Sequence, residues 1–313
     1  MSVEPNIAAS SSPLTAVPAA RRQQSSMARA FRNPSVLIGG MVIVIMVALG
    51  AAAPWLGTIN PTEPHTSGRN KLPGSDVTVR DDDGKSVKIF YRLGSDNLGR
   101  DVYSRVLYGA RISIFVGITV AIISVIAGMI IGLFSGYIRW LDPIVMRIMD
   151  GLMAIPAILL AIALVSLFRA GIGAVILAIT IPEIPRVVRL VRSVVLSVRE
   201  EPYVEAAITT GTPMLKLLWR HVLPNTIAPM IVQGTFICAS AILVEAILSF
   251  LGIGIPPETP TWGNVMAAGK DVFYLFPHNI FYPGIMLALT VLAVNMLGDG
   301  LRDTLDPKLA KRV

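Results

Sequence analysis

Apolar runs of about 20 residues, largely free of charge, alternate with polar segments along this chain, which is the pattern of helices that cross a membrane. A helix of that length is about 30 Å long and matches the hydrocarbon core of a bilayer. The pattern therefore predicts an all-α integral membrane protein with six transmembrane helices. The predicted helices cover residues 36–56, 112–138, 151–168 with an extension back to 144, 171–190, 222–244 and 279–298. The fourth run is the weakest, because Pro182, Glu183 and Pro185 interrupt it.

The distribution of charge supports membrane insertion and indicates its direction. Only 15% of the residues are charged, whereas a soluble domain has about 25%. The net charge of +7 does not predict nucleic-acid binding, because Lys and Arg flank the apolar runs and form no single patch. They concentrate in the N-terminal arm, in the second-to-third and fourth-to-fifth connections and in the tail, while the two short opposite loops hold only Arg169 and Lys270. Since positive flanks stay in the cytoplasm, both termini are expected there.

The segments outside the spans differ in composition. The first 35 residues are rich in Ser, Ala and Pro, and we expect a largely disordered cytoplasmic arm. A cleaved signal peptide ending at residues 51–53 is disfavoured, because the apolar part of a signal peptide has only about 7–15 residues. The predicted organisation is an arm at 1–35, a first helix at 36–56, an extracytoplasmic loop at 57–110, a five-helix core at 111–303 and a cytoplasmic tail at 304–313.

The long first loop contains a hairpin signal. Apolar and polar residues alternate at 77–79 and 87–89, on either side of Asp83-Gly84, a dipeptide typical of hairpin turns. Two interpretations stay open for this loop and for the 259–271 segment: a solvated connection, or a docking surface for an external partner.

Residues 196–225 form a second notable segment, between the fourth and fifth spans. The pattern predicts a helix at 200–210, a break at Gly211 and a second helix at 213–222, with Pro213 suited to a helix start. The second helix is amphipathic, with Met214, Leu217 and Leu218 on one side. Its apolar face fits either a groove on a partner protein or the lipid interface.

Catalytic and metal-binding motifs are missing from the sequence. There is no GxxxxGK[ST], HExxH, CxxC or GxSxG, and the three histidines lie in different segments. We therefore expect neither an enzyme nor a bound cofactor or metal. Glu183 is the carboxylate that lies well inside an apolar run, so it either lines a transport pathway or pairs with Arg186 three residues later. For Glu245, near the outer end of the fifth span, a structural role is favoured.

Several motifs resemble those of one transporter family. Glu205-Ala206-Ala207, Gly211 and Leu223-Pro224 have the spacing of the EAA loop of ABC importer permeases, with His221 where the family has Ile. The stretches 94–111, 248–263 and 295–307 resemble further signatures of the dipeptide and oligopeptide branch. Together these motifs resemble the C-type permease subunit of a binding-protein-dependent peptide importer.

The resemblance implies a type I importer permease fold in the inner or plasma membrane of a prokaryote. It also implies that the EAA loop forms cytoplasmic coupling helices seated in a groove of an ATPase, with Glu205, Ala206, Ala207, Gly211, Leu223 and Pro224 as the coupling residues. The implied partners are a B-type permease, two ATPases that bind ATP and Mg²⁺, an extracytoplasmic solute-binding protein and membrane lipid, with a dipeptide or oligopeptide as the solute.

Two alternatives differ in solute or in energy source. The same machinery could import nickel or another small solute. A secondary carrier driven by an ion gradient is disfavoured, because the sequence shows no internal repeat and its spans are poor in acidic residues.

Overall fold

The computed structural model describes residues 32–80, 86–168 and 171–305. It is mostly helical, which confirms the all-α class, with one two-stranded sheet. The α-helices are α2 (Pro34–Ala52), α3 (Val102–Tyr137), α4 (Asp142–Met153), α5 (Ala157–Leu167), α6 (Ile172–Arg199), α7 (Pro202–Thr209), α8 (Met214–Leu217), α9 (Leu223–Phe250), α10 (Trp262–Gly269) and α11 (His278–Leu305). Short 3-10 turns lie at Ala53–Trp55, Thr66–Gly68 and Lys270–Val272, and a π-helical segment lies at Leu218–Val222.

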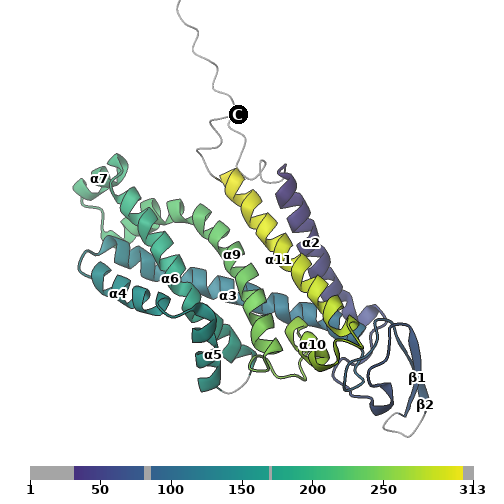
Figure 1. Ribbon diagram of the computed structural model, residues 1–313. Helices are drawn as coiled ribbons and strands as arrows, with labels where there is room; N and C mark the ends of the chain where they lie inside the picture. The colour runs from purple at the N-terminus through teal and green to yellow at the C-terminus, as the bar shows by residue number, and fades with distance from the viewer. Residues whose placement is uncertain (1–31, 81–85, 169–170, 306–313) are drawn as a thin grey trace, which may run out of the picture.

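Helices α2, α6, α9 and α11 slant across the bundle, and α3 crosses behind them (Figure 1). The hairpin of β1 (Ser75–Arg80) and β2 (Ser86–Tyr91) lies at one end with α10, and we call this the hairpin end. The start of α2, the end of α11 and α7 lie at the other, which we call the loop end. Helices α3, α6, α9 and α11 share a continuous apolar core. The start of α2 and the end of α11 are adjacent, since the Asn33 side-chain amide donates to Gly300 O.

By length and composition, four helices in the described part of the chain can cross a membrane: those at Pro34–Trp55, Val102–Tyr137, Met214–Phe250 and His278–Leu305. The predicted third span is a broken pair, α4 and α5, bent by 89° at a break that contains Pro156, and it counts as a fifth if the pair is one span. The bend follows from proline, which removes a helix hydrogen bond and restricts the residue before it.

The predicted fourth span is α6, a continuous helix of 28 residues. The interruption expected at Pro182 and Pro185 is wrong, because both prolines lie inside the helix. Packing explains the difference: Pro182, Glu183 and Pro185 are all buried, so tertiary contacts offset the lost hydrogen bonds. Helix α6 is not among the four because every stretch of 18 residues along it contains at least three charged residues, beginning with Glu183, Arg186 and Arg189.

Close contact between α3 and α6 forms the centre of the bundle. Three glycines of α3, spaced four residues apart, each face a valine of α6: Gly128 faces Val187, Gly132 faces Val191 and Gly136 faces Val195. A Cβ added to Gly132 would lie 2.7 Å from the Val191 Cβ, so there is no room for a side chain. Small residues at this spacing let two membrane helices approach backbone to backbone. The pairing runs in step along both chains, so α3 and α6 are parallel.

Helix α3 begins ten residues earlier than the predicted second span. The Asp101 carboxylate caps the helix by accepting from Ser104 N–H (2.8 Å). The first turn of α3 therefore begins at Val102 and includes Arg105. The loop predicted at 57–110 therefore ends at Asp101. The predicted span began only at residue 112 because Arg105 and Arg111 are charged, and charged residues are typical of loops outside the membrane.

The predicted hairpin is confirmed, with Val77 opposite Ile89 in an antiparallel register. Its expected turn at Asp83-Gly84 lies outside the described residues, as do residues 1–31 of the arm and 306–313 of the tail. Buried Tyr91 anchors the hairpin to the loop that follows, because its hydroxyl donates to Gly99 O (2.8 Å). Burial, with Asp101 and Asp96 nearby, raises the Tyr91 pKa to about 12, so the phenol stays a neutral donor.

Candidate coupling and transport site

The EAA loop, residues 196–225, is built around Gly211. Helix α7 ends at Thr209, and Gly211 then adopts a positive φ of +78°. Gly211 N–H donates to Ile208 O (2.9 Å) and Thr212 N–H donates to Ala207 O (3.1 Å), which is the pair of bonds that defines a Schellman motif. A Cβ added to Gly211 would meet no atom within 4 Å. The glycine is therefore needed for its backbone angle alone.

The second arm of the loop is continuous with a membrane helix. Helix α8, the π-helical segment Leu218–Val222 and α9 form one helix from Met214 to Phe250. The boundary predicted near Val222 is therefore wrong. Pro224 provides the physical reason for the π segment, because its ring cannot fit under a regular α-helical turn and it has no N–H to donate. The wider π turn lets the helix continue past the proline.

The apolar side of this loop packs on the chain's own core. Val204, Leu217, Leu218 and Val222 are all buried there. Neither expected location for these side chains, a partner groove or the lipid interface, is correct. The large apolar side chains that stay exposed in this loop are those of Tyr203, Ile208, Leu215 and Trp219.

The predicted coupling residues lie mostly on the surface of the loop. Glu205, Ala206, Gly211 and Pro224 are exposed, whereas Ala207 and Leu223 are half-buried. Helix α7 has no side-chain cap at its start, so Glu205 does not cap it.

A brace that sequence reasoning missed joins the two arms of the loop. The Tyr203 ring of α7 lies 6.1 Å from the His221 ring, centroid to centroid. Asn225 Nδ2 donates both to the Tyr203 hydroxyl (3.2 Å) and to His221 O (2.6 Å). The available signal was His221 itself, which departs from the family pattern at the position where an aromatic ring now meets Tyr203.

Glu183 is buried on α6 and faces its own chain. Its Oε1 accepts from Arg186 Nη1 (3.0 Å) and from Ser240 Oγ of α9 (3.4 Å). The geometry agrees with the local pair considered above. Two arginines further along α6 contact α4 instead: Arg189 with Asp150 and Arg192 with Asp142, the latter through two hydrogen bonds. These pairs hold α4 against the loop-end half of α6.

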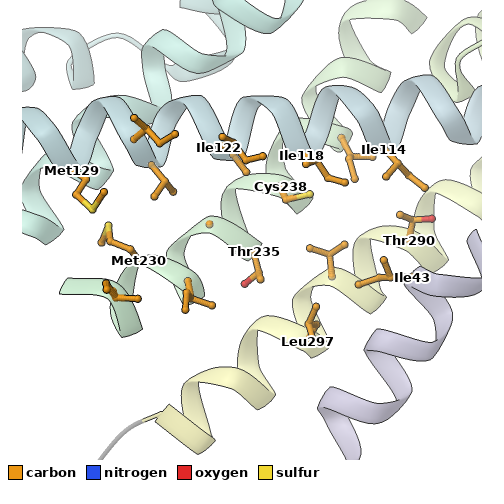
Figure 2. A pocket seen from close by; sticks show the side chains of 18 residues that line it. Ile43, Ile114, Ile118, Ile122, Met129, Met230, Thr235, Cys238, Thr290 and Leu297 are labelled. Carbon is orange, nitrogen blue, oxygen red and sulfur yellow. The ribbon is translucent and has the colours of Figure 1, made fainter. Parts of the chain in front are cut away.

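Two pockets of contrasting polarity lie along α9. The first, which we call the apolar groove, has a volume of about 500 Å³ and is lined from α2, α3, α9 and α11. Figure 2 shows isoleucines of α3, including Ile114, Ile118 and Ile122, opposite Thr235 and Cys238 of α9. The second, which we call the polar pocket, has a volume of about 640 Å³; three of its ten lining residues are polar, namely Asn225, Gln233 and Arg302, and the other seven are apolar. Glu183 lines neither of them.

The described residues contain no group of three or more His, Cys, Asp or Glu side chains placed to hold a metal ion. The arrangement combines membrane helices, two pockets and an exposed loop that ends in a membrane helix.

Comparison with known proteins gives consistent matches. The family model for the binding-protein-dependent transport system inner membrane component matches residues 124–311. A probable peptide ABC transporter permease of Sinorhizobium fredii is 48% identical, over 90% of this chain and 91% of that protein. A di/tripeptide transport system permease of Pseudomonas aeruginosa is 38% identical, over 90% and 91%. A glutathione transport system permease of Pectobacterium atrosepticum is 42% identical, over 69% and 72%.

Among solved structures, the inward-facing MetNI methionine ABC transporter aligns with 62% of this chain and 94% of the matched chain, at a TM-score of 0.47 and 18% identity. The family model covers more than half of the chain, and the relatives align along most of its length. The chain therefore belongs to the family of binding-protein-dependent transport system inner membrane components.

Proposed function

We propose that this chain is the permease subunit of an ATP-driven importer for dipeptides or oligopeptides. Membership of the family implies a multi-pass membrane protein that works with ATPase and solute-binding partners. The observation that carries the proposal is the continuity of the EAA loop with α9, because one helix links the exposed loop to the interior of the membrane domain. The relatives named for peptide and di/tripeptide transport support a peptide as the solute.

The loop end is the proposed ATPase-facing side. Gly211 sets the angle between α7 and α8, and the Tyr203 brace fixes α7 to the start of α9. Glu205, Ala206 and Pro224 would contact the ATPase, with Gly211, Ala207 and Leu223 supporting them. ATP and Mg²⁺ would bind to two ATPase subunits, and both chain termini would lie on this cytoplasmic side.

The polar pocket is the part of this chain best suited to contact a peptide. Gln233 can donate to and accept from peptide amides, the Asn225 side-chain oxygen can accept from them, and Arg302 can bind a carboxylate. The apolar groove offers only two hydroxyls and a thiol, which cannot satisfy a peptide backbone. Glu183 remains a candidate for the pathway through its link to α9. A second permease of the B-type would complete the pathway.

The hairpin is the proposed docking surface for the solute-binding protein. It lies at the hairpin end and exposes Val87 and Phe90. The 259–271 segment contributes less than its sequence suggested, because Trp262, Gly263, Asn264 and Val265 are buried. Of that segment, Lys270 and Asp271 stay exposed.

The test is uptake by a reconstituted transporter. Proteoliposomes that contain this chain, the co-purifying second permease, both ATPases and the solute-binding protein should accumulate radiolabelled di- and tripeptides when ATP is enclosed with the ATPases. Vesicles prepared without the binding protein are the control. Uptake of nickel or glutathione with no uptake of any peptide would contradict the proposed solute, and uptake without any ATPase would contradict the proposed energy source.

A further inference from the structure

Glu245 is a fully buried carboxylate near the hairpin end of α9, and the proposed coupling and pathway residues do not include it. Its Oε2 accepts from Ser113 Oγ of α3 (3.0 Å), and its Oε1 accepts from Ser249 Oγ of α9 (2.8 Å). Among the described residues, no salt bridge reaches it. A buried carboxylate without a cation is costly, so the two hydroxyls must hold it in a defined place.

Both serines extend the contact to the segment 251–261, which connects α9 to α10. Ser249 Oγ accepts from Ile255 N–H and Ser113 Oγ accepts from Trp262 N–H, each at 3.4 Å. A serine hydroxyl has one hydrogen and two lone pairs. Because each hydrogen is directed to Glu245, the lone pairs are directed to the two N–H groups. Glu245 therefore orients two acceptors, one for Ile255 within this connection and one for Trp262 at the start of α10.

Close packing reinforces the hydrogen bonds. A Cβ added to Gly263 of α10 would lie 2.5 Å from Ala246 O and 2.7 Å from Ser249 Cβ, so α10 lies directly against α9. The Trp262 side chain is fully buried, and its Nε1–H donates to Val106 O of α3 (3.1 Å). Helix α10 is thus held by α9 on one side and by α3 on the other.

The connection is also clamped at its centre. Pro257 O accepts from Arg100 Nη1 and from Arg105 Nη2, each at 3.1 Å, and Arg100 Nε pairs with Asp96 (2.7 Å). Asn264 Nδ2 lies within 3.1 Å of three carbonyl oxygens of the same connection, those of Ile255, Pro256 and Thr259. Buried polar groups with several partners hold a loop in one conformation.

Helix α9 is the element that joins this assembly to the EAA loop, since the helix is continuous from Met214 to Phe250. We propose that Glu245 is a positioning residue that fastens the 251–261 connection and α10 to α9, so that a displacement of the EAA loop is transmitted through α9 to this connection at the hairpin end. This inference rests on the proposed function, and it assigns the outward gate to the joint centred on Glu245.

The test follows the exposed tip of the connection in the complete transporter, reconstituted with its partner subunits. Glu258 is exposed, so Glu258→Cys in a Cys238→Ser background gives one reactive thiol in this chain. A membrane-impermeant maleimide should label it at rates that differ at least three-fold with and without ATP. Glu245→Leu should reduce that ratio to about one and lower peptide uptake at least ten-fold, while basal ATP hydrolysis stays within two-fold.

Two further variants keep the proposal testable if Glu245→Leu does not accumulate. Glu245→Gln keeps the size of the side chain and one acceptor oxygen, and should retain an intermediate labelling ratio. The double variant Ser113→Ala and Ser249→Ala leaves Glu245 in place but removes both serine hydroxyls that bond to it. It should reduce the labelling ratio to about one. Ser135→Ala is the control: it removes another buried serine hydroxyl of α3, one that donates to Gly132 O within its own helix, and should leave the ratio at the wild-type value.

The possible results separate this proposal from the proposed function. A wild-type ratio in Glu245→Leu, or in the double serine variant, overturns the role of Glu245 while leaving the importer assignment intact. If the transporter with Glu245 intact is labelled at the same rate with and without ATP and takes up no solute, both the role of Glu245 and the importer assignment are overturned.

Discussion

A single residue, Gly211, shows how local backbone geometry supports the proposed coupling. The sequence predicted a helix break at Gly211, and the structure shows that the break depends on an unusual backbone angle. Its φ is +78°, while the space around its α-carbon is open. The cost of replacing it therefore comes from backbone strain and depends on how well each side chain tolerates the left-handed region.

We expect Gly211→Val to cost about 1–2 kcal/mol locally, because β-branched residues strongly avoid positive φ. Gly211→Asn should be tolerated better, since Asn adopts this conformation most readily after Gly. Membrane levels should stay normal in both, while Gly211→Val loses uptake and the stimulation of ATP hydrolysis by loaded binding protein. Gly40→Val is the matched control, because Gly40 of α2 also has open space but an ordinary φ. Wild-type uptake by Gly211→Val would exclude this loop as the coupling element.

At the scale of elements, the glycine ladder of α3 explains why α6 stays helical through two prolines. Gly128, Gly132 and Gly136 bring the α3 backbone against α6, and the resulting contacts replace the hydrogen bonds that proline removes. A single sequence cannot show this, because the prolines lie in one helix and the glycines in another. At Pro156, by contrast, the helix is interrupted, and the proline lies in the break between α4 and α5.

The ladder gives a prediction about stability. Gly132→Leu should destabilise the folded protein by about 1–3 kcal/mol, because the new side chain would overlap Val191. The melting temperature of the purified complex in detergent is the measurement. Gly132→Ala should destabilise the protein by less than Gly132→Leu, because a single added carbon overlaps Val191 less than a leucine side chain does. Gly173→Leu on α6 is the control, because a Cβ there meets no atom within 4 Å. An unchanged melting temperature for Gly132→Leu would refute the close approach of α3 and α6.

For the whole molecule, the hydropathy pattern and the motifs correctly predicted the all-α class, the β-hairpin and the family. These depend on local hydropathy, on alternation and on motif spacing. They did not reach the continuity of α8 with α9, which depends on a π turn around Pro224. They also missed the early start of α3, where Arg105 is buried against Asp96 and two carbonyl oxygens. The common reason is that charged residues and prolines read as interruptions in a sequence, whereas partners far along the chain can satisfy them.

The direction of insertion is the prediction that belongs to the molecule as a whole. Most basic residues near the spans gather at the loop end, and two of them, Arg189 and Arg192, pair with aspartates of α4. Those pairs do not weaken the prediction, because orientation follows the count of Lys and Arg near the membrane and depends little on Asp and Glu. We therefore expect the loop end in the cytoplasm and the hairpin outside.

In a Cys238→Ser background, Thr78→Cys should react with a membrane-impermeant maleimide in intact cells, since Thr78 is exposed on β1. Lys216→Cys, exposed on α8, should react only after the membrane is permeabilised. The reverse labelling pattern would mean that the molecule is inserted in the opposite direction, with the EAA loop outside and out of reach of any cytoplasmic ATPase.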